Sequence, residues 1–177
     1  MLEARYLVPS ITTVEKKVKP ALVSAGAMCR GWYGLTDIMF GPAADYNSEF
    51  VRLRIARKAH IPSFAVTLTH KKTIWGLYSK ADTIILQKEF GDTTSADAFI
   101  ETEFSNALKR SFAFCRDGIE YVLGDLRIFV EDIFVPSIRW SVEIEGPNDA
   151  SIAGCAETLG LGEPICNSVP ALVQQYL

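Results

Sequence analysis

Arg52 and Arg54 have a spacing that suggests a chemical task. A single leucine separates them in the stretch 50–55, where apolar and charged side chains alternate as in a β-strand. Residues i and i+2 of a strand lie on one face, about 7 Å apart, so the two guanidinium groups form a cationic row opposite Val51, Leu53 and Ile55. Such a row could bind an extended anion. The simplest alternative is an ordinary strand with one face in water.

Charged side chains recur with the same two-residue spacing elsewhere. Glu143 and Glu145 lie two residues apart near the end of the chain, Glu3 and Arg5 do so at its start, and Lys71 belongs to a further alternation in the middle. Acids and bases on many strands suggest that the polar face of one sheet surrounds something other than bulk water. Without a ligand, these groups would neutralise one another as salt bridges.

The composition narrows the class of protein. The chain has 177 residues and a formal net charge of −3, and we expect residues 1–177 to form a single domain with a substantial core. This charge favours neither general nucleic-acid binding nor attraction to an acidic membrane. No apolar run reaches the ~20 residues that span a bilayer, and the N-terminus lacks the apolar core of a signal peptide. We therefore expect a cytoplasmic protein with no membrane partner.

Common cofactor and metal motifs are absent from the sequence. It contains neither a P-loop nor the glycine-rich dinucleotide-binding motif. The cysteines show no Cys-x-x-Cys pairing and the chain has only 2 histidines, so a structural zinc site is not expected. A bound phosphate would therefore not be held by a loop of those types.

Alternating apolar and polar residues predict about eight strands. They are expected at 2–8, 28–40, 50–55, 64–72, 82–90 and 138–145, and residues 111–135 should hold two or three more. The turn within 111–135 has two candidates. Asp117-Gly118 is the stronger hairpin dipeptide, but Gly124-Asp125 gives longer and better matched strands and is favoured.

Amphipathic stretches predict helices at 12–26, 94–108, 148–160 and 168–177. The first has a capping box of Thr12 and Glu15 and should kink or restart at Pro20. Thr94 should begin the second, and Asn148 should cap the third. The apolar stripes of these helices need a surface to cover, which the apolar strand faces supply. The charged strand faces must then point away from the helices.

The expected fold class is α+β. Short connections between strands make the sheet mostly antiparallel. An open sheet would expose its charged face to solvent, whereas closing about eight strands into a barrel would turn that face into a lumen. We therefore expect a closed antiparallel β-barrel of about eight strands, a tunnel with helices packed outside.

In order and spacing, the charged strands resemble the CYTH superfamily, the triphosphate tunnel metalloenzymes, which includes thiamine triphosphatases, inorganic triphosphatases and class IV adenylate cyclases. The resemblance covers nearly the whole chain. The matching motifs are Met1-x-Glu3-x-Arg5 for the family's opening Glu-x-Glu-x-Lys, Arg52-Leu53-Arg54 for Arg-x-Arg, Leu68-Thr69-His70-Lys71 for Leu-Thr-x-Lys, and Asp132 followed by Glu143-Ile144-Glu145-Gly146 for the closing Asp and Glu-Ile-Glu-Gly.

The sequence also departs from the family pattern. The departures are Met1 for the first opening carboxylate, Ile85 for an arginine, Gln87 for the first glutamate of the middle Glu-x-Glu, and Phe114 for the lysine of a Lys-x-Arg motif. Glu89 and Arg116 keep the second residues of the last two motifs. The loss of these charged side chains weakens the expectation of catalysis more than the expectation of the fold.

The resemblance implies a lumen that binds a triphosphate and divalent metal ions. Extended phosphates need several cations along their length, and carboxylates nearby would repel them unless a hard metal ion lies between. The expected phosphate-binding residues are Arg5, Arg52, Arg54, Lys71 and Arg116. The expected ligands of Mg²⁺ or Mn²⁺ are Glu3, Glu89, Asp132, Glu143 and Glu145, and Glu143 or Glu145 should activate the attacking water as the catalytic residue.

The function implied is metal-dependent hydrolysis of inorganic, thiamine or nucleoside triphosphate. One alternative is a catalytically impaired module of the same fold that holds polyphosphate or nucleotide without turnover. A cyclase is a weaker alternative, because nothing in the sequence identifies a nucleoside pocket. The expected partner is a small-molecule triphosphate or nucleotide, and the family also implies a homodimer as one assembly of this chain.

Overall fold

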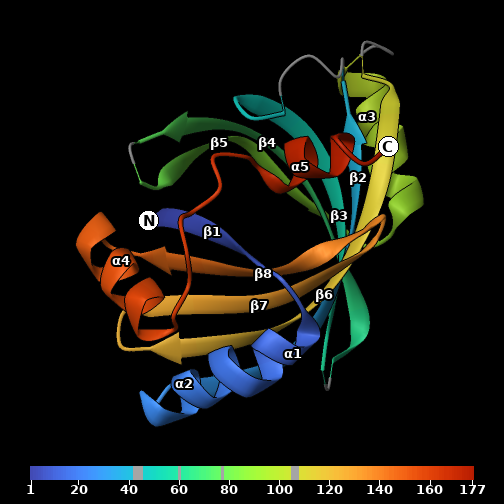
Figure 1. Ribbon diagram of the computed structural model, residues 1–177. Coiled ribbons are helices and arrows are strands. Elements are labelled where there is room, and N and C mark those ends of the chain that lie inside the picture. The colour runs from blue at the N-terminus through green and yellow to red at the C-terminus, as the bar shows by residue number, and fades with distance from the viewer. Residues whose placement is uncertain (42–45, 60, 77, 105–107) are drawn as a thin grey trace.

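Eight β-strands close into an antiparallel barrel in the computed structural model, which describes residues 1–41, 46–59, 61–76, 78–104 and 108–177 (Figure 1). The strands are β1 (Leu2–Val8), β2 (Met28–Phe40), β3 (Glu49–Lys58), β4 (Ile61–Trp75), β5 (Lys80–Phe90), β6 (Arg110–Leu123), β7 (Leu126–Val135) and β8 (Ser137–Gly146). Around the barrel they follow the order β1-β5-β4-β3-β2-β6-β7-β8. The expected closed α+β barrel is confirmed.

The strand alternation separates an inner from an outer face. On β8, Val142 and Ile144 are fully buried in the outer core, while Glu143 and Glu145 line cavities inside the barrel. The β6–β7 hairpin turns at Gly124-Asp125, where Leu123 pairs with Leu126. The favoured turn is therefore confirmed.

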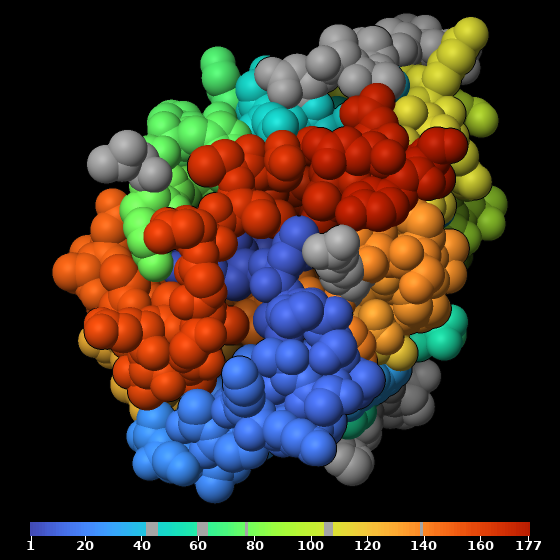
Figure 2. All heavy atoms as spheres, viewed as in Figure 1, coloured from blue at the N-terminus to red at the C-terminus, as the bar shows by residue number. Residues whose placement is uncertain are grey.

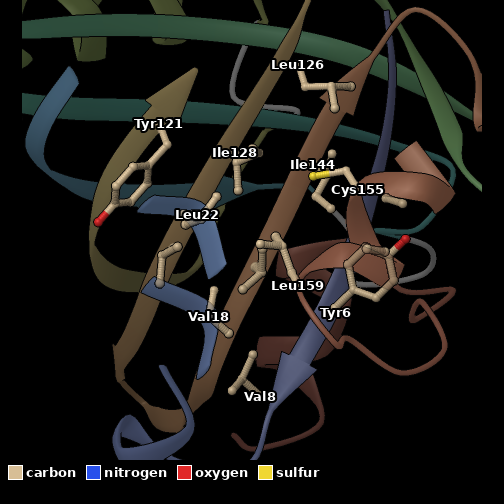
Figure 3. Packing of buried hydrophobic residues seen from close by; sticks show 14 of the residues in the cluster. Tyr6, Val8, Val18, Leu22, Tyr121, Leu126, Ile128, Ile144, Cys155 and Leu159 are labelled. Atoms are coloured by element: carbon tan, nitrogen blue, oxygen red, sulfur yellow. The ribbon is translucent and has the colours of Figure 1, made fainter. Parts of the chain in front are cut away.

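Helices cover the outer face of the barrel. Those on one side are α1 (Ile11–Thr13), a π-helical segment (Val14–Val18), α2 (Lys19–Ser24) and α4 (Asp149–Thr158). Val18 and Leu22 lie over Ile128 and Ile144 in one apolar cluster (Figure 3). On the other side α3 (Thr93–Glu103) packs on β4 and β5. No helix within the described ranges is long and apolar enough to cross a membrane.

The first helical segment begins earlier than predicted. Ser10, rather than Thr12, is the N-cap, because its side-chain oxygen accepts a hydrogen bond from the Thr13 N–H at 3.2 Å. Pro20 lies in the first turn of α2, directly after the π-helical segment. The chain therefore restarts its helix at the proline, where a missing N–H costs least.

The last helix, α5 (Val169–Gln174), closes one end of the lumen. Its apolar residues join Met39 and Phe114 in a buried cluster. The C-terminal segment lies beside the N-terminal strand on one face of the molecule (Figure 2), where the Ile165 N–H donates to the Arg5 carbonyl at 2.8 Å. One end of the tunnel is thus apolar and the remainder carries the charges.

The fifth strand has a bulge that changes which side chains face inward. β5 pairs with β1 only at Lys80 and Ala81, but it pairs with β4 along its length. The β4–β5 register shifts between His70 and Lys71, which leaves Ile85 without an opposite residue. The alternation before Ile85 is therefore out of phase with the alternation after it.

Candidate active site

Three carboxylates from two neighbouring strands meet in the lumen. Glu3 pairs with Glu145 across β1 and β8, and Glu143 is the next inward-facing residue of β8. One carboxylate oxygen from each residue lies within 4.8 Å of the other two. Hard carboxylate oxygens are the ligands that Mg²⁺ and Mn²⁺ prefer. These three side chains therefore fit the role of holding a divalent metal ion.

The three glutamates have different proton affinities. Burial and the nearby Glu143 carboxylate raise the pKa of Glu145 to about 7, and the same two causes raise the pKa of Glu3. Burial alone would raise the pKa of Glu143, but Arg5 and Arg116 lower it to about 2. At neutral pH Glu143 is therefore a carboxylate, while Glu145 can take up or release a proton.

Asp37 on β2 contacts three arginines from the two neighbouring strands, β3 and β6. It is fully buried, and Arg54 donates to both of its oxygens at 2.7 and 2.8 Å. Arg52 and Arg116 approach the same carboxylate at 3.7 and 3.6 Å. Burial would raise the pKa of Asp37, but Arg54 and Arg52 hold it well below its usual range. Asp37 therefore stays ionised and fixes the spacing of the three guanidinium groups.

Glu131 on β7 is a second buried counter-ion, on the opposite side of β6 from Asp37. Arg5 and Arg116 donate to one of its oxygens at 2.5 and 2.8 Å, and the Tyr33 hydroxyl donates to the other at 2.7 Å. Arg5 also bonds Glu143 of the metal-binding candidates. The cations and the acid cluster thus form one connected network.

β5 supplies a further cation and a further acid. Lys80 contacts Glu3, and Lys71 of β4 contacts Asp82. The Thr73 hydroxyl donates to Asp82 at 2.7 Å. Both lysines therefore lie next to the acid cluster, at the short β1–β5 seam.

Arg52 is the least satisfied of the inward-facing arginines. Its Nε is buried and has no hydrogen-bond partner among the residues that the structure describes. Burial and the neighbouring Arg54 lower the pKa of Arg52 to about 10. Its guanidinium lies 5.8 Å from the centre of the Phe50 ring. A bound anion could therefore accept a hydrogen bond from Arg52 that no described protein group accepts.

The charged network described above, around the inner cavity, contains as many carboxylates as cations. The cations are Arg5, Arg52, Arg54, Lys71, Lys80 and Arg116, and the carboxylates are Glu3, Asp37, Asp82, Glu131, Glu143 and Glu145. A bare triphosphate would add several negative charges to a balanced, largely buried site. Physical reasoning therefore requires extra cations to enter with it.

Two adjoining cavities of the lumen meet at this charged network. The inner one, of about 210 Å³, is lined mainly by the charged groups described above. The outer one, of about 610 Å³, lies among β2, β3, β6, β7 and β8. Both are lined by Arg54, Arg116, Glu143 and Glu145.

Most of the residues expected at the site lie in one place. Glu3, Arg5, Arg52, Arg54, Lys71, Arg116, Glu143 and Glu145 all line the inner cavity. Glu89 does not join them: it is exposed at the end of β5 opposite Thr67, whereas Glu3 pairs with Lys80 at the strand's other end.

The expectation that Asp132 faces the lumen is wrong. Glu131 precedes it on β7 and holds Arg5 and Arg116 inside the barrel. Asp132 pairs with Asp117 and Trp140 on the opposite face. Because neighbouring residues of a strand point to opposite faces, the acid that β7 places in the lumen is Glu131.

The departures from the family pattern lie in different surroundings. Met1 is exposed just before β1, Ile85 is the bulge residue, and Gln87 is exposed opposite Thr69. Phe114 is fully buried in the apolar cluster that α5 closes. The aromatic ring therefore replaces a charge where the lumen itself becomes apolar.

Sequence reasoning missed Asp37, Glu131, Lys80 and Asp82. Asp37 offered one signal, since it is the only acid in the otherwise uncharged or cationic stretch 28–40. Lys80 and Asp82 offered another, because they have the same two-residue spacing as Arg52 and Arg54. The bulge at Ile85 hid that spacing from any argument that ran a single alternation through 82–90.

Comparison with known proteins gives the fold. No protein-family model matches the sequence, and no curated protein matches it. Among solved structures, PH1819 from Pyrococcus horikoshii is 16% identical with a TM-score of 0.77, each chain covered to 99%. HpAC1 from Hippeastrum, an adenylyl cyclase candidate with a dominant triphosphatase activity, is 11% identical with a TM-score of 0.72, covering 99% of this chain and 95% of that one.

An adenylate cyclase candidate from Bacillus halodurans is 12% identical with a TM-score of 0.64, covering 99% of this chain and 96% of that chain. At these identities the likeness concerns the arrangement of the backbone. The chain therefore has the same fold as these solved structures, and this fold is the barrel expected from its resemblance to the CYTH superfamily.

Proposed function

We propose that this chain is a CYTH-type hydrolase that cleaves a triphosphate-containing substrate with the help of Mg²⁺ or Mn²⁺. The observation that carries the proposal is the meeting of Glu3, Glu143 and Glu145 within 4.8 Å, next to a row of buried cations. A polyphosphate and its metal ions need these two kinds of group side by side. Inorganic, thiamine and nucleoside triphosphates all share that chemistry.

The cations would bind the phosphates. Arg52 has an unused donor, and Arg54 lies beside it on the same strand face. Lys71 and Arg5 reach the same cavity from neighbouring strands. These groups approach the cavity from several strands. They would therefore contact a phosphate chain along its length and hold its phosphoryl groups in line for attack.

The three glutamates would hold the metal ions. A bound divalent metal ion would polarise phosphate oxygens and make an attacking water more acidic. Glu143 is ionised at neutral pH and is oriented by Arg5, so it is ready to act as a ligand. In the metal-free site the pKa of Glu145, about 7, lies above that of Glu143, so Glu145 is the glutamate that we assign as acceptor of a proton from the attacking water.

A module that holds its ligand without turnover is the second candidate. It is favoured by the pairing of Arg5 and Arg116 with Glu131, which gives those cations a counter-charge without any ligand. The exposed Met1 before β1 supports it too, since the first family carboxylate has no substitute there.

The test is calorimetric titration of tripolyphosphate into the protein with Mg²⁺, with Mn²⁺ and with EDTA, followed by measurement of phosphate release. The proposal expects metal-dependent binding with release. Binding without release would favour the second candidate, and no binding in any condition would overturn both.

Two variants and one control sharpen this test. Glu145→Gln should lower release at least about 100-fold, because it removes the proton acceptor. Arg52→Gln should weaken tripolyphosphate binding about 10-fold or more through the loss of a charge-assisted hydrogen bond. Arg110→Gln removes an exposed arginine that pairs with Asp97 outside the barrel, and it should change neither quantity.

A further inference from the structure

The outer cavity differs in character from the inner one. Apolar side chains line it between the charged ones: Leu35 of β2 is paired with Ala56 of β3, and Phe129 lies on β7. Tyr33 contributes its ring, which meets the Phe129 ring edge-on at 5.9 Å. The inner cavity has charged groups at most of the corresponding positions. The outer cavity therefore suits an organic group better than a phosphate.

These apolar walls are held firmly next to the acid cluster. The Tyr33 hydroxyl is bonded to Glu131, and its ring lies over Gly118, where a Cβ atom would come within 2.6 Å of it. The Arg127 guanidinium lies 4.9 Å from the centre of the Phe129 ring and donates to Glu145 at 2.8 Å. A group in the outer cavity would thus lie directly beside the candidate metal ligands.

The rim of the outer cavity is cationic. Arg30 and Lys58 line it and make no ion pair with any residue in the described part of the chain. The acids that line the cavity are already paired: Glu120 and Glu145 are bonded to Arg127, and Glu131 and Glu143 are bonded to Arg5. A positively charged organic group would be repelled here, whereas an uncharged ring with hydroxyl groups would not.

We propose that the outer cavity binds the base and sugar of a nucleoside triphosphate, whose phosphates occupy the inner cavity. This inference rests on the proposed function and names its substrate class. A volume of about 610 Å³ is within the range of small-molecule sites, and the shared Arg54, Arg116, Glu143 and Glu145 would contact the phosphates at the junction. Inorganic tripolyphosphate and thiamine triphosphate, whose organic part is cationic, would each contact the apolar walls less extensively than a nucleoside does.

The test compares three ligands by calorimetry in Mg²⁺: tripolyphosphate, thiamine triphosphate, and ATP as its non-hydrolysable imido analogue. We expect the ATP analogue to bind at least about 10-fold more tightly than either of the others, equivalent to about 1.4 kcal/mol. Tripolyphosphate binding as tight as that of the ATP analogue would overturn the inference and leave the proposed function standing. Tighter binding of thiamine triphosphate would overturn it as well, and no binding of any ligand would overturn both.

Variants of the cavity wall give an independent reading. Phe129→Ala removes an apolar contact. We expect it to weaken the affinity for the ATP analogue about 10-fold or more, while the affinity for tripolyphosphate changes less than about 2-fold. Ala56→Trp fills the same space and should have the same selective effect even if Phe129→Ala folds poorly. Phe134→Ala is the matched control, because it makes the same change at an exposed position of β7. Equal losses for both ligands in the two cavity variants would contradict the inference.

Discussion

Asp37 is one buried carboxylate on which three guanidinium groups depend. Its bidentate bond to Arg54 and its longer contacts with Arg52 and Arg116 lie in the interior, where a charge without a partner is costly. Its pKa lies well below the usual range, so its contribution to stability is complete above about pH 4 and is lost only in stronger acid.

We predict that Asp37→Asn destabilises the fold by about 3–5 kcal/mol, because it leaves buried arginines without their counter-charge. Urea denaturation measures this change. Tripolyphosphate with Mg²⁺ should restore part of the loss, since the phosphates would replace the missing negative charge. Asp97→Asn is the control: its ion pair with Arg110 is exposed, so the loss should stay below about 1 kcal/mol. Similar losses in the two variants would disprove the role given to Asp37.

Glu145 should make stability depend on pH when divalent metal ions are removed. Its folded pKa of about 7 is above the ordinary value of 4.5, so ionising it costs more in the folded state than in the unfolded state. The folded protein therefore loses stability from this group as pH rises from about 4.5 to 7. We predict that Glu145→Gln removes this loss and, in EDTA at pH 8, stabilises the protein by about 1–2 kcal/mol.

Denaturation at pH 5 and pH 8 separates this effect from a packing change. At pH 5, where Glu145 is mainly protonated, the variant and the natural protein should differ little. Adding Mg²⁺ at pH 8 should stabilise the natural protein and not the variant. A variant that is less stable than the natural protein at pH 8 in EDTA would rule out the predicted cost of ionising Glu145 in the folded state.

Whether a particular acid faces the lumen was the hardest feature to predict at this scale. Arg52, Arg54, Glu143 and Glu145 were placed correctly because each pair repeats at a spacing of two within a regular strand. Asp132 was not, because Glu131 and Asp132 are adjacent acids on a regular stretch of β7, and the sequence did not show which of the two the alternation turns inward. A shift of one residue exchanges the two faces of a strand.

At the scale of elements, a glycine of β6 leaves room for a side chain of the neighbouring strand. Gly118 pairs with Tyr33 across β2 and β6, and the tyrosine ring occupies the place of the missing Cβ. Any larger residue would push the ring away from Glu131. The Asp117-Gly118 dipeptide therefore has a packing role here rather than the turn role that its composition first suggests.

We predict that Gly118→Ala destabilises the protein by about 1–3 kcal/mol, as overpacking of a tight interior does. It should also break the hydrogen bond between Tyr33 and Glu131, which tyrosine fluorescence or the NMR signal of the hydroxyl would report. Gly154→Ala is the control within α4, where a Cβ would meet nothing within 4 Å. That change should stabilise the helix by about 0.5–1 kcal/mol, and a loss there would point to errors in the packing argument.

Helix ends were predictable where a single capping residue precedes the apolar stripe. Asn148 is such a cap, and it accepts the expected backbone hydrogen bond from the Ser151 N–H. Two capping residues compete before α3, where Asp92 rather than Thr94 accepts the hydrogen bond from Ser95. Ser10 and Thr12 compete in the same way before α1. Sequence alone does not rank neighbouring caps, because their energies differ by only a few tenths of a kcal/mol. Residues 105–107 of the predicted second helix lie outside the described residues.

At the scale of the whole molecule, closure of the barrel follows from a mismatch between the two faces of the strands. Helices cover the apolar face, and a sheet with acids and bases on its other face gains by enclosing them. The alternation was therefore enough to predict the barrel. It was not enough to predict the apolar end of the lumen, because that end is made by Met39, Phe114 and α5, which are far apart in sequence.

The balance of charge in the lumen leads to a prediction about the whole protein. Triphosphate alone would leave the lumen too negative and Mg²⁺ alone would leave it too positive, so each should bind weakly without the other. Together they should stabilise the fold by about 2.7 kcal/mol at ligand concentrations near 100 Kd, which raises the melting temperature by about 5–10 °C. Thermal melts with tripolyphosphate, with Mg²⁺ and with both measure the effect. A combined shift no larger than the sum of the separate shifts would show that anion and metal bind independently, and the acid cluster would then not serve the anion site.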